Sequence, residues 1–202
     1  MEVMDHYRQK LISPKEIITY IKPGNRIYMS SGTAIPTRVV RELVESPDFN
    51  NYDLEVIQLF TLGDFFNESA CELSKYRLIN FRAGETTGAE LCRGRVDFIP
   101  ANLVEIPYIF ATGCIEVDVA VLTVSPPDKR GYMSLGIAID IADLVAKSAK
   151  TVIAEVNPNM PVTYGETSIH LDQIDCIIES DAPLLERENR DYGQEIDRIG
   201  WH

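Results

Sequence analysis

The chain has 202 residues, of which 45% are hydrophobic and 25% are charged, and its formal net charge at pH 7 is −12. This length fits one domain with a sizeable core, and the composition is that of an ordinary globular protein. The acidic balance argues against nucleic-acid binding, because a phosphate backbone requires a concentrated basic face.

Neither targeting nor membrane insertion is indicated by the apolar pattern. The first thirteen residues lack the apolar core of a signal peptide, and no apolar run approaches the ~20 residues of a membrane helix. The four cysteines, Cys71, Cys92, Cys114 and Cys176, are widely spaced and form no CxxC pair. We therefore predict a cytoplasmic protein with reduced thiols and no zinc site, since the histidines lie far from any cysteine cluster.

The first predicted helix begins in the segment Ser13-Pro14-Lys15-Glu16. Ser13 is placed to cap it, proline suits the first turn, and Glu16 stands three residues on to complete a capping box. Ile17, Ile18 and Ile21 supply the apolar face, and the helix should end before Pro23-Gly24.

A strand over residues 26–30 leads into Ser31-Gly32-Thr33-Ala34, and a helix follows over residues 36–45. A strand that ends in a small-residue loop opening a helix is a common anion site, because free amides and the helix dipole favour negative charge. The loop lacks both the Gly-x-Gly-x-x-Gly spacing and the lysine of a phosphate-binding P-loop. A tight turn that requires small residues is therefore an open alternative.

The next predicted strand covers residues 54–61 and leads into Leu62-Gly63-Asp64. Because open α/β sheets bind ligands beyond the carboxyl ends of their strands, Thr61 and Gly63 are candidate wall positions, or they only turn the chain. A helix over residues 67–75, a strand over 76–82 and a helix over 87–95 are expected to follow.

A short strand over residues 96–99 is stopped by Pro100, and Asn102 comes next. Asn102 either caps the following helix by accepting its first-turn amides or lines a ligand cleft, since it again follows a strand end.

Residues 117–157 are the stretch around which the fold is organised. The β-branched run 117–124 is typical of a strand buried on both faces of a parallel sheet, and Pro126-Pro127 stops it. After a short strand in YMSLG, a helix over residues 139–150 and a strand over 151–156 complete a strand–helix–strand crossover unit. A last strand over residues 175–179 and a helix from residue 189 are expected after it.

Two long motifs carry a family resemblance. SPPDKRGYMSLG and AEVNPNMPVTYGETSIHLDQID resemble the N-terminal half of the acetyl-CoA hydrolase/transferase family, which includes 4-hydroxybutyrate, butyrate and succinate CoA-transferases. The likeness extends from SPKEIITYIKPGNRIYMSSGTAIP to EIDRIGWH. It implies an α/β fold with a mostly parallel sheet flanked by helices, as in the CoA-transferases. It divides the chain into a domain over residues 1–188 and, over residues 189–202, the start of a linker helix into a second half.

The resemblance also implies a reaction and its substrates. In this family a glutamate of the second half attacks an acyl-CoA thioester, and the mixed anhydride is converted by the CoA thiolate to a glutamyl-CoA thioester. A small carboxylate then takes the CoA, or water does in a hydrolase. Coenzyme A is thus a substrate, no cofactor or metal is expected, and a homodimer is implied. No catalytic residue is placed on this sequence; the residues expected to line the acyl-CoA cleft are Ser31, Gly32, Thr33, Ala34, Thr61, Gly63 and Asn102.

Glu155 and His170 are the two residues that could be mistaken for catalytic groups. Glu155 stands at a strand end, where a carboxylate commonly accepts hydrogen bonds from a loop, although it could substitute for the missing nucleophile. His170 could be a general base, but no partner carboxylate is identified, and a packed or capping histidine is the commoner case.

Two rival functions remain open from the sequence. The first is a sugar-phosphate-binding domain, because sugar-phosphate isomerases are expected to share this fold and to bind a phosphate with the loop after the first strand. The other is a non-enzymatic interaction subunit whose last helix docks a partner.

Overall fold

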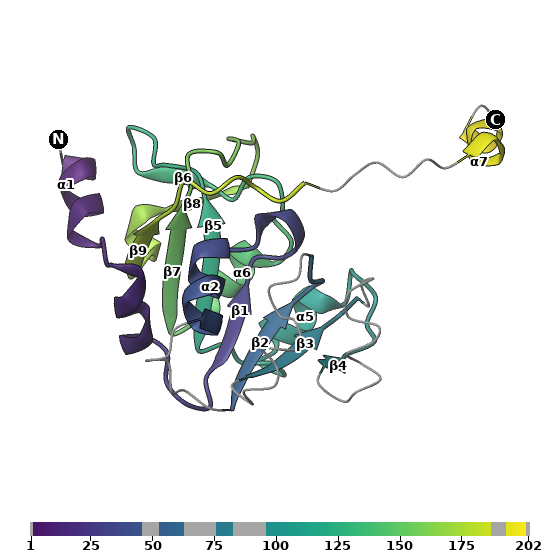
Figure 1. Ribbon diagram of the computed structural model, residues 1–202, viewed down its shortest axis with the longest axis horizontal. Helices are drawn as coiled ribbons and strands as arrows, with labels where there is room; N and C mark the ends of the chain where they lie inside the picture. Colours follow the sequence, from purple (N-terminus) through teal and green to yellow (C-terminus); the bar gives the residue numbers. More distant parts are fainter. Residues whose placement is uncertain (1, 46–52, 63–75, 83–95, 187–192, 201–202) are drawn as a thin grey trace.

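The protein is described from a computed structural model, which covers residues 2–45, 53–62, 76–82, 96–186 and 193–200. Its centre is a seven-stranded sheet in the order β4-β3-β2-β1-β5-β7-β9, and every neighbouring pair in it is parallel (Figure 1). The strands are β1 (Arg26–Met29), β2 (Leu54–Gln58), β3 (Tyr76–Asn80), β4 (Val96–Phe98), β5 (Val119–Val124), β7 (Thr151–Val156) and β9 (Cys176–Glu179). The predicted fold class, an α/β domain with a mostly parallel sheet, is confirmed.

Helices cover both faces of this sheet. One face packs against α5 (Ile106–Ala111) and α6 (Ala142–Ser148), and the other against the 3-10 helix η1 (Pro14–Thr19) and α2 (Thr37–Glu45). All six residues of β5 are buried, with Ala120 and Leu122 in the first cluster and Val119 and Val121 in the second. The continuous apolar run of β5 therefore reflects burial on two sides.

The predicted crossover unit is present as β5, α6 and β7. Helix α6 is shorter than the expected 139–150, because Asp140 takes a positive φ of 43° and Ala149 is extended. The predicted short strand in YMSLG is β6 (Tyr132–Ser134), and it pairs antiparallel with β8 (Ser168–His170), a strand that the sequence did not predict. Strand β8 leads into the 3-10 turn η3 (Leu171–Gln173).

The chain start also differs from the sequence prediction. Helix α1 (Glu2–Gln9) was not predicted, and the first predicted helix is the 3-10 helix η1 rather than an α-helix. Its capping box is present, with the Ser13 amide donating to the Glu16 carboxylate at 2.7 Å. Between α1 and η1, the Ile12 amide donates to the Ile177 carbonyl and the Ile177 amide to that of Lys10, so this segment covers the outer edge of β9.

Strands β2 and β3 end three and two residues earlier than predicted, at Gln58 and Asn80. The reason at β2 is a change of partner, since the Leu59 amide donates to the Ser31 hydroxyl instead of to a neighbouring strand. The predicted helices over 67–75 and 87–95 lie outside the described residues, as do Gly63, Cys71 and Cys92. The last predicted helix is seen as α7 (Gly193–Gly200).

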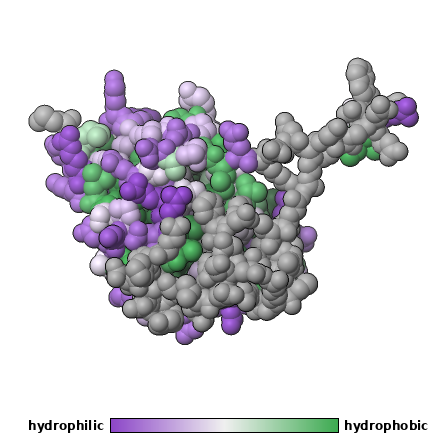
Figure 2. Space-filling view, in the orientation of Figure 1, coloured by the Kyte–Doolittle hydropathy of each residue, from purple (hydrophilic) through white to green (hydrophobic). Residues whose placement is uncertain are grey.

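No helix in the described part of the chain is long and apolar enough to cross a membrane. In the view of Figure 2, hydrophilic side chains cover much of the surface near α1 and over β6 and β8, and apolar ones form small separate areas.

Candidate functional site

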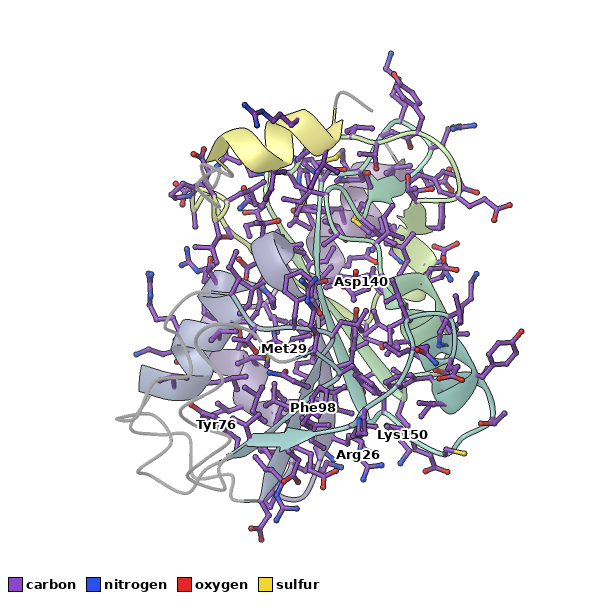
Figure 3. All side chains as sticks on the ribbon, turned by 90° about the vertical axis from the view of Figure 1, so that its right-hand side faces the viewer. Arg26, Met29, Tyr76, Phe98, Asp140 and Lys150 are labelled. Carbon is purple, nitrogen blue, oxygen red and sulfur yellow. The ribbon has the colours of Figure 1, made fainter. Side chains whose placement is uncertain are left out.

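The seven parallel strands all end at one edge of the sheet, where α/β proteins bind their ligands. Figure 3 shows Met29, the last residue of β1, with Asp140 beyond it, while Arg26 and Lys150 lie at the opposite edge. The predicted site residues after β1 and β2 come together at this carboxyl edge.

The loop after β1 is tied to the exit of β2. The Ser31 hydroxyl in this loop accepts a hydrogen bond from the Leu59 amide at 2.9 Å, and the Gly32 amide donates to the Phe60 carbonyl at 3.2 Å. Residues 32–34 form the 3-10 turn η2 (Gly32–Ala34). Gly32 has a φ of +59°, and a Cβ there would lie 2.5 Å from the Phe60 ring. The small residues thus serve a close backbone approach.

Thr61 belongs to a buried polar network at the ends of β1, β2 and β3. Its hydroxyl donates to the Gln58 side chain at 2.9 Å, and the Asn80 amide lies 3.2 Å from the same hydroxyl. Gln58 in turn donates to the Ser30 carbonyl at 3.3 Å. Gln58 and Asn80 were not predicted as site residues, although a polar residue at the end of an otherwise apolar strand is a usable signal.

Asn102 does not form the predicted helix cap. Helix α5 begins four residues later, with Glu105 at the capping position. The Asn102 side chain donates to the Glu105 carboxylate at 3.0 Å, and it is the backbone carbonyl of Asn102 that accepts the amides of Glu105 and Ile106. Asn102 is exposed in the loop that follows β4.

Glu155 accepts hydrogen bonds from the first turn of α2. Its carboxylate lies 3.0 Å from the amides of Arg38 and Val39, and the side chain is only 1% exposed. Burial raises the pKa of Glu155 above its usual range, and the two amides, the Ser180 hydroxyl and the Arg38 charge partly offset this. Glu155 is a strand-end acceptor, as the sequence favoured, but its donors are helix amides rather than a loop. These two amides at the N-terminus of α2 therefore already have a partner.

His170 uses both ring nitrogens within the protein. Its Nδ1 accepts from the Asp172 amide at 3.2 Å, and its Nε2 lies 2.9 Å from the Arg130 carbonyl, which can only accept. The ring meets that of Tyr132 edge-on, with 4.8 Å between the centroids. The predicted packed and capping histidine is confirmed. The Asp172 carboxylate also lies 3.2 Å from Nδ1, but both ring nitrogens already have partners within this turn, so the geometry does not favour a general base.

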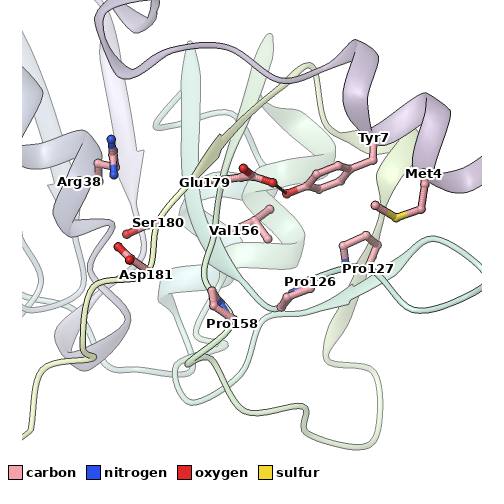
Figure 4. A pocket seen from close by; sticks show the side chains of 10 residues that line it. All are labelled: Met4, Tyr7, Arg38, Pro126, Pro127, Val156, Pro158, Glu179, Ser180 and Asp181. Atoms are coloured by element: carbon pink, nitrogen blue, oxygen red, sulfur yellow. Dashed lines mark hydrogen bonds between the residues drawn. The ribbon is translucent and has the colours of Figure 1, made fainter.

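One hollow at the carboxyl edge, of about 620 Å³, lies beyond the ends of β5, β7 and β9 (Figure 4). Pro126 and Pro158 belong to its wall, and Arg38 faces it from the start of α2. On the side of α1, the Tyr7 hydroxyl donates to Glu179 at 3.0 Å. Burial and this carboxylate raise the pKa of the Tyr7 phenol, so Tyr7 remains a neutral donor.

A second hollow, of about 350 Å³, lies beyond β2 and β3 and is called here the apolar depression. It is lined by Leu59, Phe60, Phe81, Arg82, Ala101, Leu103, Ile106 and Asp140. Six of these eight residues are apolar, and only Arg82 and Asp140 carry charge. Among the described residues, no group of three or more His, Cys, Asp or Glu side chains is placed to hold a metal ion.

The parallel sheet covered by helices on both faces defines an α/β domain, with hollows at its carboxyl edge. A family model described as the acetyl-CoA hydrolase/transferase N-terminal domain matches residues 1–186. The chain belongs to this family, as its sequence motifs predicted.

Named relatives are CoA-transferases. The chain is 34% identical over 200 residues to the 4-hydroxybutyrate coenzyme A transferase of Clostridium kluyveri. The aligned region covers 99% of this chain and 46% of the relative. It is 29% identical over 187 residues to the succinyl-CoA:acetate/propanoyl-CoA:succinate CoA transferase of Fasciola hepatica, covering 92% of this chain and 38% of that protein. The chain therefore spans less than half the length of these relatives.

Two solved structures have a similar fold over nearly the whole chain. RipA from Yersinia pestis superimposes with a TM-score of 0.86 at 28% identity, over 96% of this chain and 47% of that one. The 4-hydroxybutyrate CoA-transferase from Porphyromonas gingivalis gives a TM-score of 0.70 at 28% identity, over 91% of this chain and 42% of that chain.

Proposed function

We propose that this chain is the N-terminal half of an acyl-CoA:carboxylate CoA-transferase or acetyl-CoA hydrolase, and that it forms part of the acyl-CoA cleft. The observation that carries the proposal is the family match over residues 1–186, together with CoA-transferase relatives that align with nearly the whole chain. By the same resemblance, we infer a cytoplasmic homodimer whose partners are an acyl-CoA, a small carboxylate and a C-terminal CoA-transferase domain.

The nucleophile in this proposal is a glutamate of the C-terminal half. Its carboxylate oxygen attacks the thioester carbonyl and expels CoA thiolate, which then attacks the glutamyl carbonyl of the anhydride and releases the first acid. Support comes from the described carboxyl edge, where Glu155 is engaged with two amides and His170 with its own turn. Neither residue is free to act as nucleophile or base.

The rival sugar-phosphate function meets an electrostatic obstacle. A phosphate at the loop after β1 would need the free amides at the N-terminus of α2, and Glu155 already accepts those of Arg38 and Val39. A phosphate there would have to displace the buried Glu155 side chain from these amides. The geometry therefore favours a loop that acts as a wall rather than as a phosphate cradle.

Binding and turnover separate the proposed function from its rivals. Isothermal titration of the 202-residue chain should detect acetyl-CoA and no ribose 5-phosphate or glucosamine 6-phosphate. An assay of thiol release and acyl exchange with acetate should show no turnover by this chain alone, because the attacking carboxylate is elsewhere. Sugar-phosphate binding would favour the isomerase-like function, and turnover would reopen the role of Glu155.

Thr33 provides a sharper test of the predicted wall. Of the three hydroxyl groups among the predicted site residues, those of Ser31 and Thr61 are engaged within the protein, while Thr33 is half-buried and forms no hydrogen bond with the described residues. We expect Thr33→Val to weaken acetyl-CoA binding about threefold to tenfold, because one hydrogen bond to the ligand is lost. The unfolding midpoint should stay unchanged. The matched control is Thr112→Val, at the end of α5. Equal affinities of the two variants would remove Thr33 from the wall.

A further inference from the structure

The apolar depression has the size and lining of a pocket for a small organic molecule. Its volume of about 350 Å³ is at the lower end of the range for ligand sites, ~300–1,000 Å³. Two aromatic side chains, Phe60 and Phe81, and the aliphatic Leu59, Leu103 and Ile106 form its walls. Leu103 is 73% exposed at its rim, which leaves apolar surface for a ligand to cover.

Its two charged residues come from different segments of the chain. Arg82 follows β3, where its amide donates to the Leu59 carbonyl. Asp140 comes shortly before α6 and lies beside Ser31, a residue of the loop after β1. Because β2 runs between β1 and β3, the two strand ends are about 10 Å apart at the usual spacing of neighbouring strands. The structure shows no ion pair between Arg82 and Asp140, nor between Arg82 and any other described residue. A ligand across the depression would therefore meet a cation at one end and a carboxylate at the other.

Asp140 is held in place by its surroundings. Its φ of 43° is uncommon for a residue with a Cβ, and such conformations persist where neighbouring structure enforces them. Asp140 is exposed to solvent, yet the protein atoms around its carboxyl group raise its pKa, and the Ser31 hydroxyl partly offsets this. A second negative charge beside this carboxylate would be repelled by it.

Tyr28 adds an unpaired polar group near Ser31 and Asp140. Its side chain is fully buried, and its phenol oxygen has no hydrogen-bond partner among the described residues. The Ser31 hydroxyl lies close enough to influence the phenol electrostatically, but the geometry falls short of a hydrogen bond. A buried group left unpaired in a native fold calls for an explanation, and a polar network completed by a ligand is one.

We propose that the apolar depression selects a short monocarboxylic acid, with the acid carboxylate on Arg82 and an uncharged tail facing Asp140. This inference rests on the proposed function, in which a free acid accepts CoA. Arg82 supplies a planar guanidinium that can bind a carboxylate through two hydrogen bonds. A dicarboxylate of the same length places its second carboxylate against Asp140, where like charges repel.

Butyrate and succinate test this selection, because they share a four-carbon skeleton and differ in charge at the far end. Titrations of the 202-residue chain can be followed in methyl NMR spectra, in which Leu59, Leu103 and Ile106 report from the depression. We expect butyrate to bind about tenfold more tightly than succinate, as one close like-charge contact predicts. Asp140→Asn should bring the two affinities within about threefold of each other, and Arg82→Gln should weaken butyrate about tenfold.

Matched controls remove the same charges outside the depression. Asp143→Asn lies three residues away on α6, where Asp143 pairs with Lys147, and Arg77→Gln removes a cation that pairs with Asp97 at the other end of β3. Both controls should keep the preference for butyrate. Equal binding of succinate by the native chain, an unchanged ratio in Asp140→Asn or unshifted methyl signals would overturn the inference. If acetyl-CoA still binds in that case, the proposed function stands and only the acid site is wrong.

Discussion

Replacing Glu155 with alanine is expected to lower the free energy of unfolding by about 3 kcal/mol. The Glu155 side chain is 1% exposed and accepts the amides of Arg38 and Val39, so its removal leaves a buried donor at Val39 and a partly buried donor at Arg38 without this partner. Urea unfolding followed by circular dichroism measures the change. A variant as stable as the native chain would show that water or relaxation of α2 satisfies these amides.

Glu155→Gln separates the hydrogen bonds from the charge. The carboxamide oxygen can still accept an amide, so this variant should lose less stability than the alanine variant. Because burial raises the pKa of native Glu155 above its ordinary value of 4.5, folding favours the protonated form. The stability that this preference contributes is complete below about pH 4.5 and is lost as the pH rises through the native pKa. The glutamine variant lacks this loss, so its stability relative to the native chain should improve from pH 4.5 upward.

Gly32→Ala is expected to cost about 3 kcal/mol in the free energy of unfolding. A left-handed conformation costs an L-residue about 1–2 kcal/mol, and the new Cβ would in addition lie 2.5 Å from the Phe60 ring. Since Phe60 lines the apolar depression, the displacement should also weaken butyrate binding there. The same urea unfolding and NMR titrations measure both effects.

Gly24→Ala is the matched control for that variant. Gly24 also has a positive φ, +78°, but a Cβ there would meet no atom within 4 Å. Gly24→Ala should therefore lower the free energy of unfolding by only about 1–2 kcal/mol, the cost of the left-handed backbone conformation, and leave ligand binding unchanged. If the two glycine variants lose the same stability, the packing of Phe60 against the loop is not a constraint.

The sequence predicted a specific pair of hydrogen-bond partners where the two residues are local in the chain. The capping box at Ser13 and Glu16 lies within one turn, and it is present. Asn102 failed as a cap because α5 starts four residues later, where Pro107 in the first turn is the start signal that the sequence prediction did not use. Arg82 and Asp140 were missed for another reason: one follows β3 and the other precedes α6, and nothing in the linear order relates them.

The amino-acid sequence by itself determined the class of fold, because continuous apolar runs, proline stops and a helical stretch between strands specify a parallel sheet covered on both faces. It also carried the family motifs. Only the tertiary structure decided which polar groups meet: Glu155 caps a helix that begins more than a hundred residues earlier, and Thr61 joins Gln58 and Asn80 from neighbouring strands. Hydrophobic periodicity sets which side of an element is buried, whereas the partner of a buried hydrogen-bonding group depends on strand order and register.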